Sequence, residues 1–126
     1  MIKREAAFTQ LFRHWLKANP MYSAAFELKQ TTTDSLPFSD VQEHQMAALM
    51  AAEGEGLIYK APDDSRGIKP FDIFYLRHAT SYIVIKYPHF FVIILARVFG
   101  YEKAMSARKS LTSRRARELS TVCVEL

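Results

Sequence analysis

Apolar residues recur at helical spacing near the start of the chain. Within residues 4–18 they follow one stripe of a helix, at Phe8, Leu11, Phe12, Trp15 and Leu16. This pattern predicts a helix that ends at Asn19-Pro20, because the residue before a proline disfavours the helical conformation. Residues 21–30 then fit a strand, with Phe26 and Leu28 directed into the core.

A second helix is predicted after a polar loop at residues 31–38. Ser39 can cap its start, and Gln42, three residues later, can complete a capping box. Alanine-rich sequence then continues the helix to about Glu53, where Gly54 or Gly56 can close it.

The second half of the chain is predicted to be mostly strand. Residues 57–60 fit a short strand, and residues 71–76 and 82–87 fit a hairpin around residues 77–81. Residues 90–95 continue as strand. Residues 96–106 are ambiguous and include a helix broken near Gly100 as one solution. A short basic helix at residues 112–119 and a closing strand at 121–125 follow.

This order of elements predicts an α/β fold, with a mixed β-sheet flanked by helices. The strand-helix-strand unit of residues 21–60 should form a right-handed crossover between parallel strands, and the later strands should extend that sheet antiparallel. A chain of 126 residues can bury one core but not two, so we expect a single domain over residues 1–126.

The composition adds limits on where the protein works. The chain is 49% hydrophobic and 24% charged, which is ordinary for a globular protein, and no apolar run approaches the ~20 residues of a membrane span. The first residues contain no apolar signal segment. Cys123 is the only cysteine, and its neighbours Val122 and Val124 predict a buried thiol. We therefore expect a cytoplasmic protein without a membrane partner, in a cell or in the host of a virus.

The net charge of +4 permits an anionic partner without requiring one. Basic residues crowd one C-terminal stretch, at Lys103, Arg108, Lys109, Arg114, Arg115 and Arg117. A solvated helix face is one interpretation of this cluster. Contact with DNA phosphates, through Arg108, Lys109, Arg114, Arg115 and Arg117, is the other.

The clearest candidate chemistry lies in Phe26-Glu27-Leu28-Lys29. Residues two apart on a strand share a face, so Glu27 and Lys29 should project together. A carboxylate can hold Mg²⁺, and a neighbouring ammonium can offset charge on a phosphate in the transition state. For an isolated E-x-K the plainer interpretation is an ion pair on an exposed face.

Two further groups fall on or beside apolar helix stripes. Glu5 precedes Phe8 and Phe12 by three and seven residues, so it either points partly inward or occupies a frayed first turn. His44 and Gln45 fall on the apolar face of the second helix. They would form either a satisfied structural network or part of a site beside the E-x-K strand.

The run AFELKQTTTDSLPFSDVQEHQMAAL, residues 25–49, resembles the core of RecU-type Holliday-junction resolvases of the PD-(D/E)XK nuclease superfamily. In that family an E-x-K strand, a polar Ser/Thr-Pro loop and a helix carrying Glu-His-Gln follow one another at similar spacing. The triplet here is Glu43, His44 and Gln45. The resemblance covers about residues 5–60, continues loosely through the later strands and fades at the C-terminus.

The resemblance implies a restriction-endonuclease-like fold and cleavage of branched DNA, such as four-way junctions, with Mg²⁺ or Mn²⁺. It implies a homodimer, because two symmetric nicks need two sites. Glu27 and Lys29 match the catalytic strand, Glu5 matches the first-helix glutamate, and His44 and Gln45 join the catalytic set. The strands at 82–87 and 90–95 are candidates for the dimer surface.

The chain departs from the family at one position. An aspartate normally lies on a strand about a dozen residues before the E-x-K, and here His14, Trp15, Leu16 and Lys17 fill that interval. Asp72 is our candidate replacement as a metal ligand, ahead of Asp34 and Asp63-Asp64. An active nuclease requires such a carboxylate. Without one, a non-catalytic DNA-binding or recombination-mediating relative is the alternative, and a protein-interaction module is a third.

Overall fold

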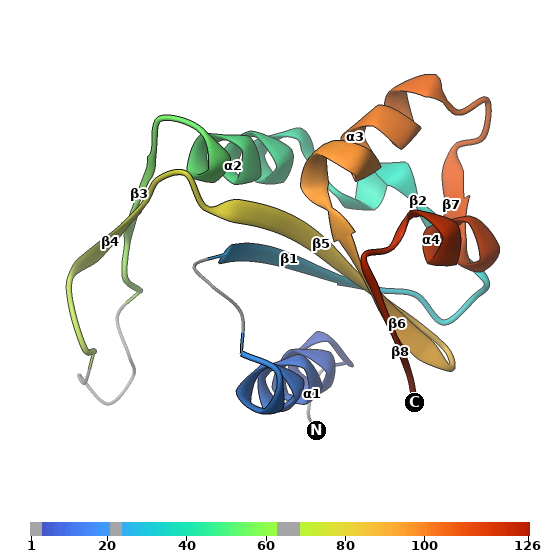
Figure 1. Ribbon diagram of the computed structural model, residues 1–126, viewed down its shortest axis with the longest axis horizontal. Coiled ribbons are helices and arrows are strands. Elements are labelled where there is room, and N and C mark those ends of the chain that lie inside the picture. Colours follow the sequence, from blue (N-terminus) through green and yellow to red (C-terminus); the bar gives the residue numbers. More distant parts are fainter. Residues whose placement is uncertain (1–3, 21–23, 63–68) are drawn as a thin grey trace.

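The computed structural model describes residues 4–20, 24–62 and 69–126, with side chains inside the first helix described from residue 6 onward. Helices are interspersed among strands along the chain (Figure 1). In order they are α1 (Arg4–Ala18), β1 (Ala24–Gln30), β2 (Ser35–Pro37), the 3-10 turn η1 (Phe38–Asp40), α2 (Glu43–Glu53), β3 (Leu57–Lys60), β4 (Ile73–Leu76), β5 (Thr80–Tyr87), β6 (Phe90–Leu95), α3 (Ala96–Met105), β7 (Ser110–Thr112), α4 (Ser113–Leu119) and β8 (Val122–Glu125).

The central sheet has four strands in the order β1-β5-β6-β8. β1 runs parallel to β5, with Glu27 opposite Ile83 and Lys29 opposite Ile85. β6 pairs antiparallel with β5, and β8 pairs antiparallel with β6. The predicted mixed α/β class is therefore confirmed, and β1 lies at an edge of the sheet.

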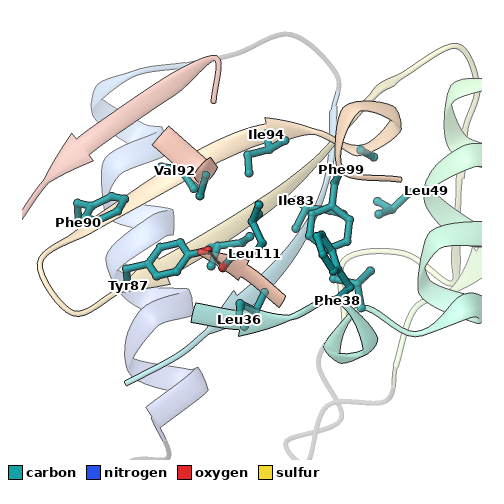
Figure 2. Packing of buried hydrophobic residues seen from close by; sticks show 14 residues of the cluster. Leu36, Phe38, Leu49, Ile83, Tyr87, Phe90, Val92, Ile94, Phe99 and Leu111 are labelled. Atoms are coloured by element: carbon teal, nitrogen blue, oxygen red, sulfur yellow. Dashed lines mark hydrogen bonds between the residues drawn. The ribbon is translucent and has the colours of Figure 1, made fainter. Parts of the chain in front are cut away.

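Helices cover both faces of this sheet (Figure 1). On one face, Phe8 and Phe12 of α1 pack against Val84, Phe91 and Ile93. On the other face, α2, α3 and α4 contribute to a second cluster that Figure 2 shows, with members Leu49, Ile83, Val92, Ile94, Phe99 and Ala116. β5 and β6 are buried from both sides, so the prediction that their surfaces form a dimer contact is wrong.

A buried hydrogen bond fixes the small ribbon of β2 and β7 onto this second face. The Tyr87 hydroxyl donates to the carbonyl oxygen of Leu111 at 2.9 Å (Figure 2). Leu36 of β2 and Leu111 of β7 face each other in the ribbon and are both fully buried. Burial raises the pKa of Tyr87 well above its ordinary value, so the hydroxyl remains a donor.

The strands β3 and β4 form a separate two-stranded antiparallel ribbon. It extends from the end of α2 away from the body of the sheet, at the left of Figure 1. Gly56, which begins the ribbon, has a φ of 136°, and a Cβ there would lie 2.4 Å from the ring of Tyr75. The turn from α2 into β3 therefore requires a glycine.

Two predicted pairings and one predicted loop are wrong. β4 pairs with β3 and not with β5, so residues 71–87 do not form a hairpin. β3 does not join the sheet of β1, so the crossover that begins at β1 ends at β5. The predicted loop at 31–38 contains β2, which reaches its partner β7 from far along the chain.

Several helix predictions are confirmed or refined. α1 and α4 occupy the predicted ranges, and α3 continues unbroken through Gly100. The N-cap of α2 is Gln42 and not Ser39, because η1 occupies the residues where the cap was expected.

The prediction of a buried thiol is wrong. Cys123 is exposed, because it lies on β8, an outer strand of the sheet. Within the described part of the chain, no helix is both long and apolar enough to cross a bilayer.

Candidate functional site

Glu27 and Lys29 project from β1 toward α2, as their spacing predicts. Lys29 Nζ lies 3.4 Å from Glu27 Oε1, and the two side chains are 16% and 27% exposed, lysine first. Their neighbours on β1, Phe26 and Leu28, pack against the core under α1. The pair is thus half-buried on one side of an edge strand, which sets it apart from an ion pair free in solvent.

Gln45 holds the Glu27 carboxylate from the first turn of α2. Its Nε2 donates to Glu27 Oε1 at 3.1 Å, and its own Oε1 accepts the backbone N–H of Gln42 at 2.9 Å. The second bond closes one half of a capping box, so the amide can present only its NH₂ group to Glu27. Gln45 therefore positions Glu27, and the positive end of the helix favours the carboxylate there.

His44 is exposed beside the half-buried Gln45, so the expectation that both side chains lie on the apolar face of the helix is wrong for His44. The first turn of α2 points Gln45 at the sheet and leaves His44 at the surface. His44 nevertheless lines a hollow that Glu27 also lines. It is available to a bound molecule and makes no hydrogen bond in the part of the chain that is described.

Two hollows meet at Glu27. One, of about 270 Å³, lies between α1 and β1 and is lined by Phe8, Thr9 and residues 26–30. The other, of about 450 Å³, lies between β1, α2 and the β3–β4 ribbon. Phe26 and Glu27 line both, so a molecule can reach the carboxylate from either side of the free edge of β1.

Glu27 is the one predicted metal ligand that the structure places on β1 beside the hollows, and it could supply a single carboxylate to an ion. The side chain of Glu5, in the first turn of α1, lies outside the described residues, and so do Asp63 and Asp64. Asp34 accepts a hydrogen bond from the Ser113 hydroxyl beside the β2–β7 ribbon. Among the described residues, no group of three or more His, Cys, Asp or Glu is close enough to hold a metal.

Asp72 does not occupy the expected position. It precedes β4, whose partner is β3, so it does not pack beside the Glu27 strand. Its carboxylate is 90% exposed and pairs with Lys69 at 3.5 Å. The signal used to select it, an aspartate inside an apolar strand, was misleading because the strand begins one residue later and its ribbon has an exposed face.

The five predicted DNA-binding cations divide into two groups. Arg115 forms two hydrogen bonds with Glu102 and one with Glu118, while Arg117 bonds Glu125 at 2.5 Å and covers the Phe90 ring. These hydrogen bonds lower the pKa of Glu102 and of Glu125. Arg108, Lys109 and Arg114 form no ion pair within the described ranges, and Arg108 and Arg114 line a hollow of about 560 Å³.

Two sets of residues that line hollows are not among the residues predicted from the sequence. Tyr59 and Phe74 line the hollow beside Glu27, and their position depends on a β3–β4 pairing that the pattern did not predict. The second set lines a basic hollow on the outer face of α1, with members Gln10, Arg13, His14 and Lys17. The sequence contains a pattern that could have identified this second set, because Arg13, His14 and Lys17 follow Gln10 by three, four and seven residues and so share one helix face.

No family model matches the sequence, and a search of curated proteins finds no match. Glu27, Lys29 and Gln45, together with the hollows that adjoin them, are therefore the features on which a function can be proposed.

Proposed function

We propose that this protein is a metal-dependent endonuclease that cuts phosphodiester bonds in branched DNA, with Glu27 and Lys29 as its catalytic residues. A RecU-like, restriction-endonuclease-like core is part of the proposal. The observation that carries it is the contact set of Glu27, Lys29 and Gln45 on an edge strand with hollows on both sides. A structural ion pair would not need a helix amide to orient its carboxylate toward an open hollow.

The residues have separable roles. Glu27 would hold Mg²⁺ or Mn²⁺ together with a phosphate oxygen of the substrate, since Mg²⁺ is commonly bound by one or two carboxylates plus phosphates. The bound ion would supply Lewis-acid activation of the phosphodiester. Lys29 Nζ, beside Glu27, would offset the negative charge that builds on the phosphate. Gln45 would keep the carboxylate in one orientation while the substrate enters and leaves.

The proposal includes a homodimer, because a junction cut symmetrically on two strands needs two sites. The apolar side chains for such a contact are on the outer face of the β3–β4 ribbon. Ile58 is 68% exposed there, and Ile73 is 60% exposed.

A non-catalytic DNA-binding relative is the second candidate. The observation that favours it is that, among the residues that the structure describes, Glu27 belongs to no group of three or more His, Cys, Asp or Glu that could hold a metal. In such a protein Lys29 and the unpaired arginines would contact phosphates without bond cleavage.

One experiment separates the two candidates. A labelled four-way junction and a linear duplex of the same sequence are incubated with the protein and Mg²⁺ or Mn²⁺, and products and complexes are resolved on parallel gels. We expect metal-dependent nicks in the junction by the wild type and none by Glu27→Gln. Junction binding without nicks in either metal supports the non-catalytic relative. Failure to bind DNA at low salt rejects both.

A further inference from the structure

The larger hollow at Glu27 has two unlike walls. One wall is polar, where Glu27, His44 and Gln45 meet. The opposite wall is the inner face of the β3–β4 ribbon, where Tyr59 and Phe74 are direct partners with ring centroids 5.4 Å apart. Its volume of about 450 Å³ is in the range of pockets that take small organic groups.

The aromatic wall is not explained by core packing. Tyr59 remains 54% exposed although it faces the body of the protein, and Phe71, edge-on to Phe74, is 51% exposed. Leu49 and Leu57 continue the apolar lining toward α2. An open apolar slot with rings on one side and hydrogen-bonding groups on the other matches a flat heterocycle with a polar edge.

The position of the slot limits which heterocycle it can take. Glu27 lines the slot and contacts Lys29, so a group in the slot is next to the phosphate position of the proposed reaction. In a nucleic acid the flat group adjacent to a phosphate is a nucleobase. The base must be unpaired, because its hydrogen-bonding edge has to face Glu27, His44 and Gln45 while one of its faces lies against the rings.

We propose that this slot binds one unpaired nucleobase next to the phosphate that is cut, which selects DNA with open bases over intact duplex. This inference rests on the proposed nuclease function and specifies its substrate. Stacking of a base on aromatic side chains strengthens binding roughly 5- to 150-fold. Extrusion of a paired base from duplex weakens binding by roughly 100-fold, which cancels most or all of that gain. Branch points and single-stranded ends avoid that cost.

The test is a binding experiment in EDTA that does not depend on cleavage. A single-stranded oligonucleotide with one 2-aminopurine is titrated with protein, and both the affinity and the fluorescence quenching on stacking are measured. We expect quenching by the wild type and tighter binding than to duplex of the same sequence. Tyr59→Leu and Phe74→Leu keep apolar bulk but lose a ring, and each should weaken binding roughly 10-fold and reduce quenching.

Two controls complete the test. Tyr59→Phe keeps the ring and should bind as the wild type does, and Tyr101→Leu removes an exposed ring on α3 that does not line the slot. If Tyr59→Leu and Phe74→Leu bind and quench normally, or if Tyr101→Leu loses as much, the slot proposal is overturned. Quenching without any metal-dependent cleavage would uphold the slot and reject the nuclease, whereas cleavage without quenching would do the reverse.

Discussion

The side-chain amide of Gln45 donates to Glu27 across 3.1 Å, although 18 residues separate the two in sequence. The same amide accepts the N–H of Gln42, so one side chain both starts α2 and orients the carboxylate on β1. Helix stability and site geometry are thus linked at a single residue, and separating them needs variants that disturb each alone.

The first prediction concerns Glu27 and Lys29. Glu27→Gln removes the charged ligand and Lys29→Ala removes the ammonium, so each should lower the cleavage rate by ~100-fold or more. Junction affinity should change little, because it comes from many phosphate contacts. Single-turnover cleavage and anisotropy titrations measure the two effects. Near wild-type cleavage by either variant would end the assignment of this site.

The second prediction concerns Gln45 as a positioning residue. Gln45→Leu should lower kcat about 10- to 100-fold with KM unchanged, because residues that orient a metal ligand have effects of this size. It should also lower the free energy of unfolding by about 0.5–2 kcal/mol through the lost cap.

The matched control for Gln45→Leu is Thr112→Ala. Thr112 caps α4 by accepting the Arg115 N–H at 3.2 Å, away from β1. Loss of the Thr112 hydroxyl should lower the free energy of unfolding by a similar amount without reducing kcat. Equal kcat losses in both variants would mean that Gln45 acts through stability alone.

The third prediction concerns salt dependence. Because Arg115 and Arg117 are paired with glutamates, the phosphate contacts of the C-terminal region should come from Arg108, Lys109 and Arg114. Each contact removed should flatten the slope of log K against log salt by about 0.9 on duplex DNA. The slope is measured from DNA affinities at several salt concentrations for three proteins: Glu27→Gln alone, Glu27→Gln with Arg114→Ala, and Glu27→Gln with Arg115→Ala. A flatter slope for Arg115→Ala than for Arg114→Ala would contradict the inference that Arg114, and not the glutamate-paired Arg115, contacts phosphate.

The fourth prediction concerns acid stability. The hydrogen bond from Arg115 lowers the pKa of Glu102 below its ordinary 4.5. A carboxyl group with a lowered folded pKa stabilises the fold above its unfolded pKa, and that contribution is lost as the pH falls through the folded value. Tm of the wild type should therefore drop more steeply than Tm of Arg115→Gln between about pH 5 and pH 3. Arg114→Gln, at an exposed neighbour, should follow the wild-type curve.

The sequence pattern correctly predicted the features that depend only on the geometry of one helix or strand. The stripe at Phe8 and Phe12 predicted α1, and the two-residue period of β1 predicted that Glu27 and Lys29 share a face. The position of Gln45 on the apolar stripe of α2 predicted that it turns inward. Each of these inferences needs only the geometry of one helix or strand.

Long-range pairing could not be predicted in the same way. The apolar run of β4 could pair with β5 as well as with β3. Similarly, nothing local to β2 indicates that it pairs with β7, where Leu36 lies opposite Leu111, 75 residues later in the chain. The partners of Arg115 and Arg117 are on α3 and β8, so charge counts along the sequence overstated the free cations. Asp72 was misjudged for the same reason, since its neighbours depended on the pairing of β4.

The outer edge of β1 has no partner strand among the residues that the structure describes. An unpaired edge presents N–H and C=O groups that another extended chain can bind, which is a route to aggregation. A strand that paired there would reduce the contact with water of Glu27 and Lys29, two half-buried charges that contact each other. These charged side chains therefore disfavour pairing of a second chain along this edge of the sheet.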